Sequence, residues 1–400
     1  MLSLDSISSR EELLDDFNTL YTLNSEILNL FITLNDIKYN NNNKNSCHMD
    51  ICSISKVLRL AYYGTNIERK YDLWNKTNLI DLIQLSAKAH DHRTGMFIRK
   101  DFEYNEDFKN KYENEEIFYF SFIPRCKTET KKINRLMEIN FPRWLKHDQE
   151  DFLKIPLNHN FLSNNEYLYI RDESYFKGNW DYIFDENKTR MGNFHCGRGE
   201  SINIPMMEGG SIMIPKYECK TTNSLIVKLE YKNYKHAMFI IMPNEPHTKS
   251  ELIDFCKNIL NGEKLFDYQT KLLHKSYKKW FMPKFEIETE WYLNSRNPQL
   301  SVYNEKTPYF SILFKNNLID FSTICNKMKD RRDEGIELTS VSRFKNTEYG
   351  TTMLSKIMTL EYENDDDDDD DDDMLIINKS FIYMIMDDLN SIVNIGIFVG

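Results

Sequence analysis

Apolar residues recur near the helical period in the first part of the chain. A capping-box pattern, Ser9 followed by Glu12, precedes a series of apolar side chains at this spacing: Leu13, Phe17, Leu20, Ile27 and Phe31. A second set at a similar spacing predicts another buried helix: Ile54, Val57, Leu58 and Ala61. The polar run Asn40–Asn43 between them predicts a solvated loop.

From about residue 165 the pattern changes to short apolar runs that predict β-strands. These runs are Leu168–Ile170, Leu225–Leu229, Met238–Met242, Phe285–Ile287, Phe381–Met386 and Ile392–Phe398. Residues 66–150 are mixed, charged and aromatic, and they predict only loosely placed helices. Helices followed by strands predict an α+β fold. Because no Pro/Gly/Ser-rich linker divides the chain, we expect residues 1–400 to form a single domain.

The net charge of −11 is concentrated in one place. Nine of these charges lie in Asp365–Asp373, which leaves −2 for the rest of the chain. No basic stripe stands out, so we do not expect nucleic acid as a partner. The Asp run could bind Ca²⁺, serve as an acidic interaction segment, or form a solvated loop tip. Calcium loops alternate their ligands around a Gly turn, which this run does not, so we favour the self-repelling loop tip.

No motif of an enzyme active site is present: the chain lacks a Gly-x-Ser-x-Gly elbow, a Walker loop and a dinucleotide fingerprint. We therefore expect neither an enzyme nor a cofactor. His90-Asp91-His92 has no third ligand nearby in sequence and predicts a polar loop rather than a metal site. Cys47 and His48 are adjacent, and neighbours rarely align as a thiol–imidazole pair. The seven scattered cysteines argue against a disulfide scaffold.

A series of segments in the second half matches the motifs of one family in the correct order. They are Tyr175–Trp180, Thr189 with Phe194 and His195, Ile204–Met207, Leu229–Lys232, Ala237–Glu245, Met282–Ile287, Asp320–Ser322, and Asn378–Met386 with Gly396. Each match is weak alone, but their order makes the set specific. From about residue 165 to its end the chain resembles the serpin family. Before that the likeness is thin, with Cys52–Ser55 and Ile133-Asn134 as its traces.

The resemblance implies three β-sheets, about nine helices and an exposed reactive loop, here about residues 350–377. It also implies a monomer whose partner is a target protease, and a suicide-substrate mechanism in which the cut loop inserts into the central sheet. The implied reactive bond joins Asn364 to Asp365. The implied hinge residues are Glu348, Gly350 and Thr351. The implied breach residue, where the sheet first opens, is Trp180.

The chain departs from the family pattern at the hinge and at the shutter, the polar cluster where the central sheet parts. Tyr349 replaces an acid, and the bulky Met353 and Leu354 stand where inhibitory members have small residues. Overpacking could slow insertion until the protease escapes. The implied shutter residues are Asp50, Ser53 and Asp172, in which the two carboxylates replace Ser and Asn.

Three functions remain open at the level of sequence. Inhibition of a serine or cysteine protease is the leading one. The second is a non-inhibitory binding or structural protein whose loop is cut as a substrate, and the third is a virion-associated role. The composition is rich in Asn, Tyr, Lys and Ile, which an AT-biased genome such as that of a large DNA virus would produce. No signal peptide or membrane-spanning run is seen, which favours an intracellular, host-cytoplasmic or virion location over secretion through a signal peptide.

Overall fold

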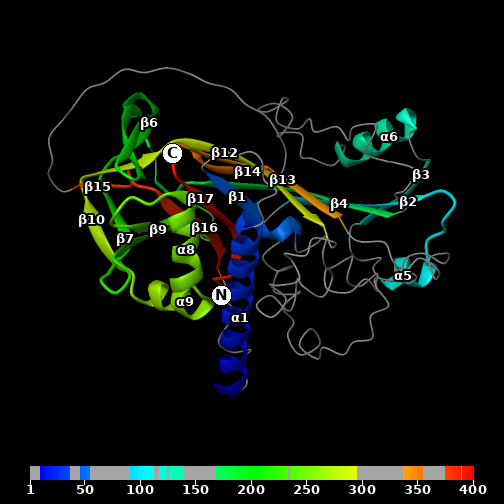
Figure 1. Ribbon diagram of the computed structural model, residues 1–400, viewed down its shortest axis with the longest axis horizontal. Helices are drawn as coiled ribbons and strands as arrows, with labels where there is room; N and C mark the ends of the chain where they lie inside the picture. Colours follow the sequence, from blue (N-terminus) through cyan, green and yellow to red (C-terminus); the bar gives the residue numbers. More distant parts are fainter. Residues whose placement is uncertain are drawn as a thin grey trace.

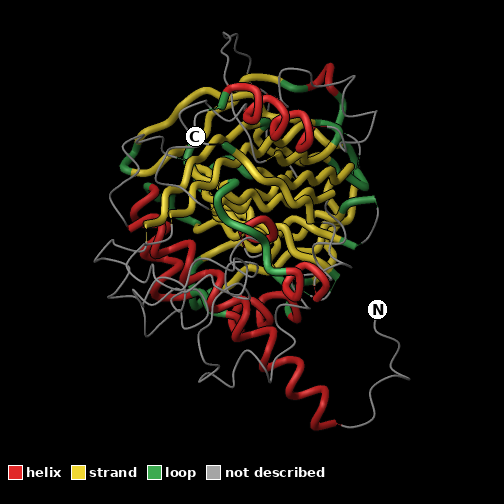
Figure 2. The backbone as a smooth tube through the Cα atoms, turned by 90° about the vertical axis from the view of Figure 1, so that its right-hand side faces the viewer, coloured by secondary structure: helices red, strands yellow, loops and turns green. Residues whose placement is uncertain are grey.

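Three β-sheets form the body of the molecule, as the family resemblance implied (Figure 1). The computed structural model describes residues 10–36, 46–54, 91–111, 117–123, 126–138, 168–182, 184–232, 235–294, 337–354, 374–388 and 390–400. Within these ranges the strands gather in the middle and the helices lie around them (Figure 2). The fold is thus α+β.

The six-stranded sheet extends from the middle of the molecule to its right-hand side in Figure 1. In spatial order its strands are β12 (Phe285–Asn294), β13 (Glu337–Thr347), β14 (Gly350–Leu354), β4 (Leu168–Asn179), β2 (Asp91–Arg99) and β3 (Ile117–Phe122). All neighbours are antiparallel except β2 and β3. The short strand β14 therefore lies between two longer strands, β13 and β4.

A seven-stranded sheet packs against the six-stranded one. Its strands, in spatial order, are β1 (Cys47–Asp50), β17 (Ile392–Phe398), β16 (Phe381–Asp387), β9 (His236–Pro243), β8 (Ser224–Glu230), β7 (Ile212–Cys219) and β10 (Leu273–Tyr277). Strand β16 is apolar throughout because its alternate residues are buried in two different hydrophobic cores, one on each face of the sheet. Ile382 and Met384 face the helices, whereas Tyr383 and Ile385 face the six-stranded sheet.

The four-stranded sheet and the helices complete the fold. The sheet contains β15 (Met374–Ile376), β11 (Lys279–Pro283), β6 (Glu200–Gly209) and β5 (Arg190–Gly197). The helices are α1 (Arg10–Asp36), α5 (Glu106–Lys111), α6 (Lys127–Glu138), η2 (Glu186–Lys188), α8 (Lys249–Ile259) and α9 (Gly262–Thr270). Thr248 caps α8 through a capping box with Glu251. None of the described helices is long and apolar enough to cross a membrane.

Most of the predicted elements are confirmed. All six predicted strands lie inside observed ones, within β4, β8, β9, β12, β16 and β17. Helix α1 begins at Arg10, directly after the predicted cap Ser9, which itself lies outside the described residues. Residues 51–54 are helical, while the rest of the second predicted helix and Asn40–Asn43 lie outside the described residues.

One expectation for residues 66–150 was wrong, and two strands there were missed. Helices α5 and α6 are present as loosely predicted, but strands β2 and β3 were not predicted. Asp91 and His92 begin β2 instead of forming a polar loop, and they pair with Tyr175 and Ser174 of β4. The physical reason is that β2 finds its partner far away in sequence, so pairing overrides the polar character of its first residues.

Candidate functional site: the hinge and the loop-insertion sheet

The turn from β13 to β14 depends on Gly350. Its φ of +146° lies in a region that residues with side chains rarely adopt. A Cβ at this position would lie 2.0 Å from the carbonyl oxygen of Gly178 in β4. The Thr347 hydroxyl donates to the Gly350 carbonyl oxygen at 3.1 Å and fixes the turn. Gly350 thus lets the chain reverse directly beside the neighbouring strand.

Glu348 anchors the same turn through contacts with two neighbouring side chains. Its side chain is buried and accepts hydrogen bonds from Thr189 Oγ1 at 2.8 Å and Lys284 Nζ at 3.0 Å. Lys284 Nζ also lies 3.0 Å from the second carboxylate oxygen. Burial opposes ionisation, yet hydrogen bonds from its own backbone, Lys284 and Thr189 outweigh it and hold the pKa of Glu348 below its usual value. The turn between β13 and β14, the expected hinge, is therefore held by an ionised, hydrogen-bonded carboxylate.

Trp180, directly after β4, contacts the turn between β13 and β14 at the end of the six-stranded sheet. The residue is only 1% exposed, and its ring stacks on Tyr231 with centroids 4.7 Å apart. Its indole Nε1–H donates to the Thr347 carbonyl oxygen at 3.0 Å, and its backbone N–H donates to the Tyr349 carbonyl oxygen at 3.1 Å. Trp180 therefore binds the turn through both its side chain and its backbone. Tyr349 itself is exposed.

Thr351 faces the interior of the molecule. It is fully buried, and its hydroxyl accepts a hydrogen bond from the Tyr231 hydroxyl at 2.9 Å. Burial raises the pKa of Tyr231, so this phenol stays protonated and can donate. Two residues further on, Met353 pairs in register with Phe344 of β13 and Phe176 of β4. Both phenylalanines are buried.

The two ends of the expected reactive loop are strands. Gly350–Leu354 form β14 inside the six-stranded sheet rather than part of an exposed loop, which differs from the expectation for this segment. Met374–Ile376 form β15, which pairs with β11 in the four-stranded sheet. Residues 355–373 lie outside the described residues. These include the expected reactive bond Asn364–Asp365 and the run Asp365–Asp373.

The structure brings the expected shutter residues into one network. Ser53 Oγ donates to Asp172 at 2.9 Å, and the Ser53 backbone N–H donates to Asp50 at 3.2 Å. Ser174 Oγ also donates to Asp50, and Thr94 Oγ1 donates to Asp172 at 2.6 Å. Ser53 thus connects the two carboxylates. The network joins β1, β2 and β4. It includes Ser174, which is next to Tyr175, the residue of β4 that pairs with the end of β14.

Cys47 and His48 do not form a catalytic pair. They are consecutive in β1, so their side chains point to opposite faces. Cys47 Sγ contacts Asn35 Oδ1 at 3.3 Å, whereas His48 Nδ1 lies 3.0 Å from the Tyr383 hydroxyl. Burial raises the pKa of Cys47 and lowers the pKa of His48 to about 3. Among the described residues, no cluster of three or more His, Cys, Asp or Glu could hold a metal ion.

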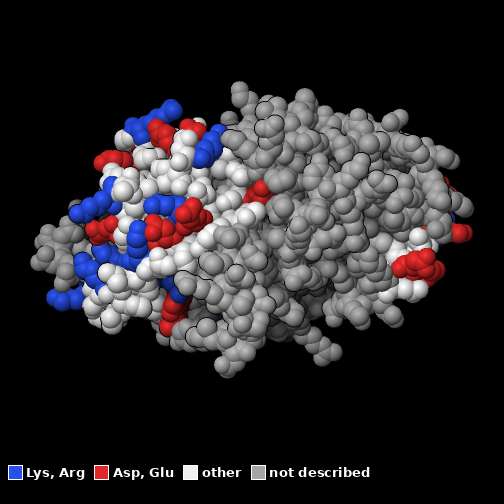
Figure 3. All heavy atoms as spheres, turned by 90° about the horizontal axis from the view of Figure 1, so that it is seen from below, with Lys and Arg blue, Asp and Glu red and all other residues white. Residues whose placement is uncertain are grey.

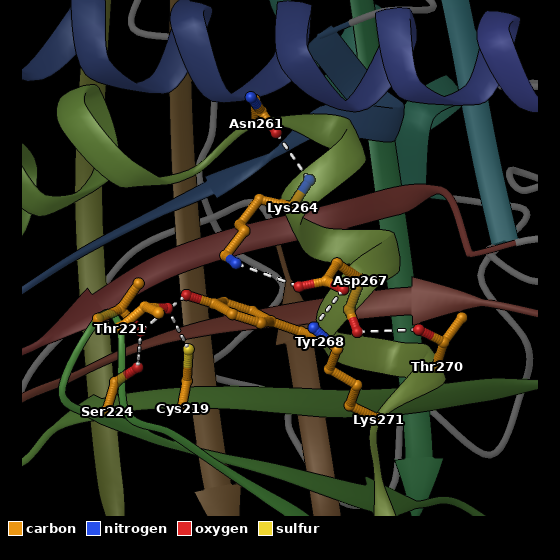
Figure 4. A network of polar contacts seen from close by, with 10 residues as sticks. Cys219, Thr221, Ser224, Asn261, Lys264, Asp267, Tyr268, Thr270 and Lys271 are labelled. Carbon is orange, nitrogen blue, oxygen red and sulfur yellow. Dashed lines mark hydrogen bonds and ion pairs between the residues drawn. The ribbon is translucent and has the colours of Figure 1, made fainter.

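A second polar network fastens helix α9 to the hairpin between β7 and β8 (Figure 4). The Tyr268 hydroxyl donates to Thr222 Oγ1 at 3.0 Å, and Asp267 bridges Lys264 and Lys271 at 3.1 and 2.6 Å. Cys219 lies under this network and is 2% exposed. Burial opposes ionisation of its thiol, but hydrogen bonds from the hairpin threonines lower its pKa to about 6. The network is a structural contact that leaves the thiol enclosed.

Sequence reasoning named the candidate hinge residues but not the side chains that they contact. Thr189, Tyr231 and Lys284 all lie in matched motifs, yet nothing local indicates that they meet Glu348 or Thr351. Lys284 is 64 positions from Glu348, and Thr189 is 159 positions away. At the shutter, Ser174 could have been found from strand alternation, two residues after Asp172. Thr94 carried no signal, because β2 was not predicted.

Comparison with known proteins agrees with this architecture. A family model described as Serpin (serine protease inhibitor) matches residues 53–400. Antitrypsin of Bombyx mori is 23% identical over 51% of this chain and 52% of its own length. Iripin-8 of Ixodes ricinus is 26% identical over 44% of this chain and 43% of its own. The chain spans about half the length of the curated relatives it matches.

Solved structures match nearly the whole chain in fold. A loop-inserted structure of cleaved ovalbumin has a TM-score of 0.69 at 11% identity, covering 96% of this chain and 99% of that one. Human thyroxine-binding globulin complexed with its hormone has a TM-score of 0.67 at 16% identity, covering 96% and 99%. At sequence identities this low, the matches show a shared fold and nothing about function. Because the family model covers most of its length, the chain belongs to the serpin family.

Proposed function

We propose that this chain inhibits a protease as a suicide substrate, through insertion of its loop between β13 and β4. One observation carries the proposal. Strand β14 pairs with only Arg343–Thr347 of β13 and Tyr175–Asn179 of β4, although both strands extend further. Among the described strands, none pairs with the remaining Glu337–Ser342 of β13 on that side. The two edges offer a place for more of the loop.

The register of β14 predicts how the loop would continue. Because Leu354 pairs with Tyr175, continued antiparallel pairing would set Ser355 opposite Ser174 and Ile357 opposite Asp172. The inserted loop would therefore reach the shutter network that holds Asp50, Ser53 and Asp172. We propose that these residues form the shutter, and that insertion proceeds over them from the hinge at Glu348, Gly350 and Thr351.

The chemical step belongs to the target protease. Its serine or cysteine nucleophile attacks a carbonyl carbon of the loop, which we propose is that of Asn364. The Asn364–Asp365 peptide bond breaks, the proton of the nucleophile passes to the new amino group of Asp365, and Asn364 remains as an acyl-enzyme. Insertion must precede hydrolysis of that acyl bond if the protease is to be trapped. The chain acts as a single domain and monomer, and it contributes no catalytic group or cofactor.

The test is formation of a complex that survives SDS. The chain is incubated with a panel of serine and cysteine proteases, and the acylated residue is identified by mass spectrometry. The variant Thr351→Arg places a charge where the wild-type side chain is fully buried, so we expect it to be cut without trapping the protease. Tyr349→Arg is the matched control, because Tyr349 is 66% exposed. A chain that is cut by every protease without a stable complex would refute inhibition.

The alternative is a non-inhibitory protein whose loop is only a substrate. Bulky residues favour it, since Met353 and Leu354 occupy positions where overpacking typically costs about 1–3 kcal/mol. Against it, β14 already accommodates both residues in the sheet. In the experiment above, cleavage without a complex, followed by no gain in thermal stability, would favour this alternative.

A further inference from the structure

A lysine-rich edge lies at one end of the molecule. Residues 271–279 contain four lysines and no acidic residue. Lys271 pairs with Asp267 at 2.6 Å, and Lys279 approaches Glu208 only to 3.8 Å. Among the described residues, Lys275 and Lys278 form no ion pair of their own, and the acidic neighbour of Lys275, Glu218, is already paired with Lys216. We refer to Lys275, Lys278 and Lys279, all exposed, as the basic edge.

The basic edge follows an unpaired side of a sheet. Strand β10 is the outermost strand of the seven-stranded sheet, and its first four residues are exposed. Lys275 lies in β10, Lys278 connects β10 to β11, and Lys279 begins β11. Figure 3 shows that lysine and arginine side chains gather, with acidic ones between them, at the end of the molecule where Figure 1 places β10 and β15. An occupant of this surface should therefore be acidic.

The chain itself supplies an acidic segment that ends at this surface. Strands β11 and β15 are parallel, and Lys279 pairs in register with Met374. One position earlier stand Lys278 in one chain segment and Asp373 in the other. Neighbouring strands lie about 4.8 Å apart, so Met374, to which the Asp run is joined in sequence, lies beside the basic edge. The run carries nine negative charges and no lysine or arginine of its own.

We propose that the acidic run Asp365–Asp373 docks on the basic edge. Exposed ion pairs are individually weak, but the attachment at Met374 gives the run a high effective concentration at this surface. Contact with three lysines also relieves part of the repulsion among nine adjacent carboxylates. The docked run lies on the carboxyl side of the proposed reactive bond, so it stays with the four-stranded sheet when the preceding part of the loop inserts.

The test is zero-length cross-linking of the full chain with a water-soluble carbodiimide, which joins a carboxylate to an amine in direct contact. At low salt we expect intramolecular cross-links from Asp365–Asp373 to Lys275, Lys278 and Lys279, identified by mass spectrometry. At 1 M salt the screening length falls to about 3 Å, and the yield should fall at least about threefold. A synthetic nona-aspartate peptide in excess should lower the yield as well.

Two triple variants make the result specific. Lys275→Gln, Lys278→Gln and Lys279→Gln together should abolish these cross-links, and they should make the loop more sensitive to proteolysis. The matched control replaces Lys127, Lys131 and Lys132, three exposed lysines on α6 at the opposite end of the molecule (Figure 1). Reversing both partners, with Lys→Glu on the edge and Asp→Lys in the run, should restore cross-linking.

Three results would overturn the proposal. One is a run that cross-links equally to the lysines of α6. Another is a yield that does not change in the basic-edge variant. The third is cross-links that join two molecules, which would identify a second copy as the occupant. None of these readouts depends on a protease, so failure of protease inhibition and failure of docking can be told apart.

Discussion

At the scale of single residues, the turn that we propose as the hinge depends on one buried carboxylate, Glu348. Hydrogen bonds from Lys284 and Thr189 keep Glu348 ionised and so stabilise the folded state above the carboxyl's unfolded pKa. This contribution should disappear as the pH falls through the lowered folded pKa. We expect Glu348→Gln to lower the free energy of unfolding at pH 7 by about 1.5–3 kcal/mol, with a smaller difference in acid. Chemical denaturation at both pH values checks this, with the exposed Glu200→Gln as control.

Glu26 of α1 has the opposite dependence on pH. It is 6% exposed, and one of its carboxyl oxygens has no hydrogen-bond partner among the described residues. Burial raises its pKa to about 8, so the folded state holds a proton that the unfolded state releases above about pH 4.5. Wild-type stability should therefore fall as the pH rises from about 4.5 to about 8, by up to about 1.4 kcal/mol per unit.

The variant Glu26→Gln should lose this dependence and be more stable than the wild type at pH 8. The control is the exposed Glu263→Gln in α9, which removes a carboxylate from a helix that contacts α1. Denaturation curves between pH 4 and pH 9 give the answer. Parallel curves for wild type and Glu26→Gln across this range would show that Glu26 ionises normally.

At the scale of elements, we expect strand β14 to determine whether loop insertion in the proposed mechanism is faster than hydrolysis of the acyl-enzyme. Met353 pairs with Phe344 and Phe176, both buried. If overpacking of about 1–3 kcal/mol fell on the insertion barrier, it would slow insertion by roughly five- to 150-fold. We expect Met353→Ala to raise the fraction of protease trapped per loop cut, measured as the stoichiometry of inhibition. Thr352→Ala, one position away and on the other face by alternation, should leave it unchanged.

An element could be predicted from the sequence when the residues within it carry the pattern, and not when its order comes from partners far away in the chain. Strand β16 is apolar at every position because both faces are buried, and a pattern search finds it. Strand β2, Asp91–Arg99, begins with four polar residues and gains its order from β4, at least seventy positions away. The site shows the same division. Gly350 and Thr351 could be found from a motif, while the contact of Thr351 with Tyr231 exists only in the folded chain.

At the scale of the whole molecule, the parts of β13 and β4 that no described strand pairs with on their facing sides predict a change in stability after the loop is cut. Residues Ser355–Leu360 would continue β14, and each paired residue would add backbone hydrogen bonds to both neighbours. Insertion also buries the apolar Ile357, which by alternation shares the inward face with Thr351, and this adds hydrophobic stabilisation. Cutting between Leu360 and Asp365 with a broad protease, then heating the product, should therefore reveal a much higher melting temperature than that of the intact chain. The same cut in Thr351→Arg should give no such gain, because a buried charge at the start of β14 destabilises the inserted strand. A cut wild-type chain that melts like the intact one would mean that the sheet does not accept the loop, and the trapping mechanism would then be excluded.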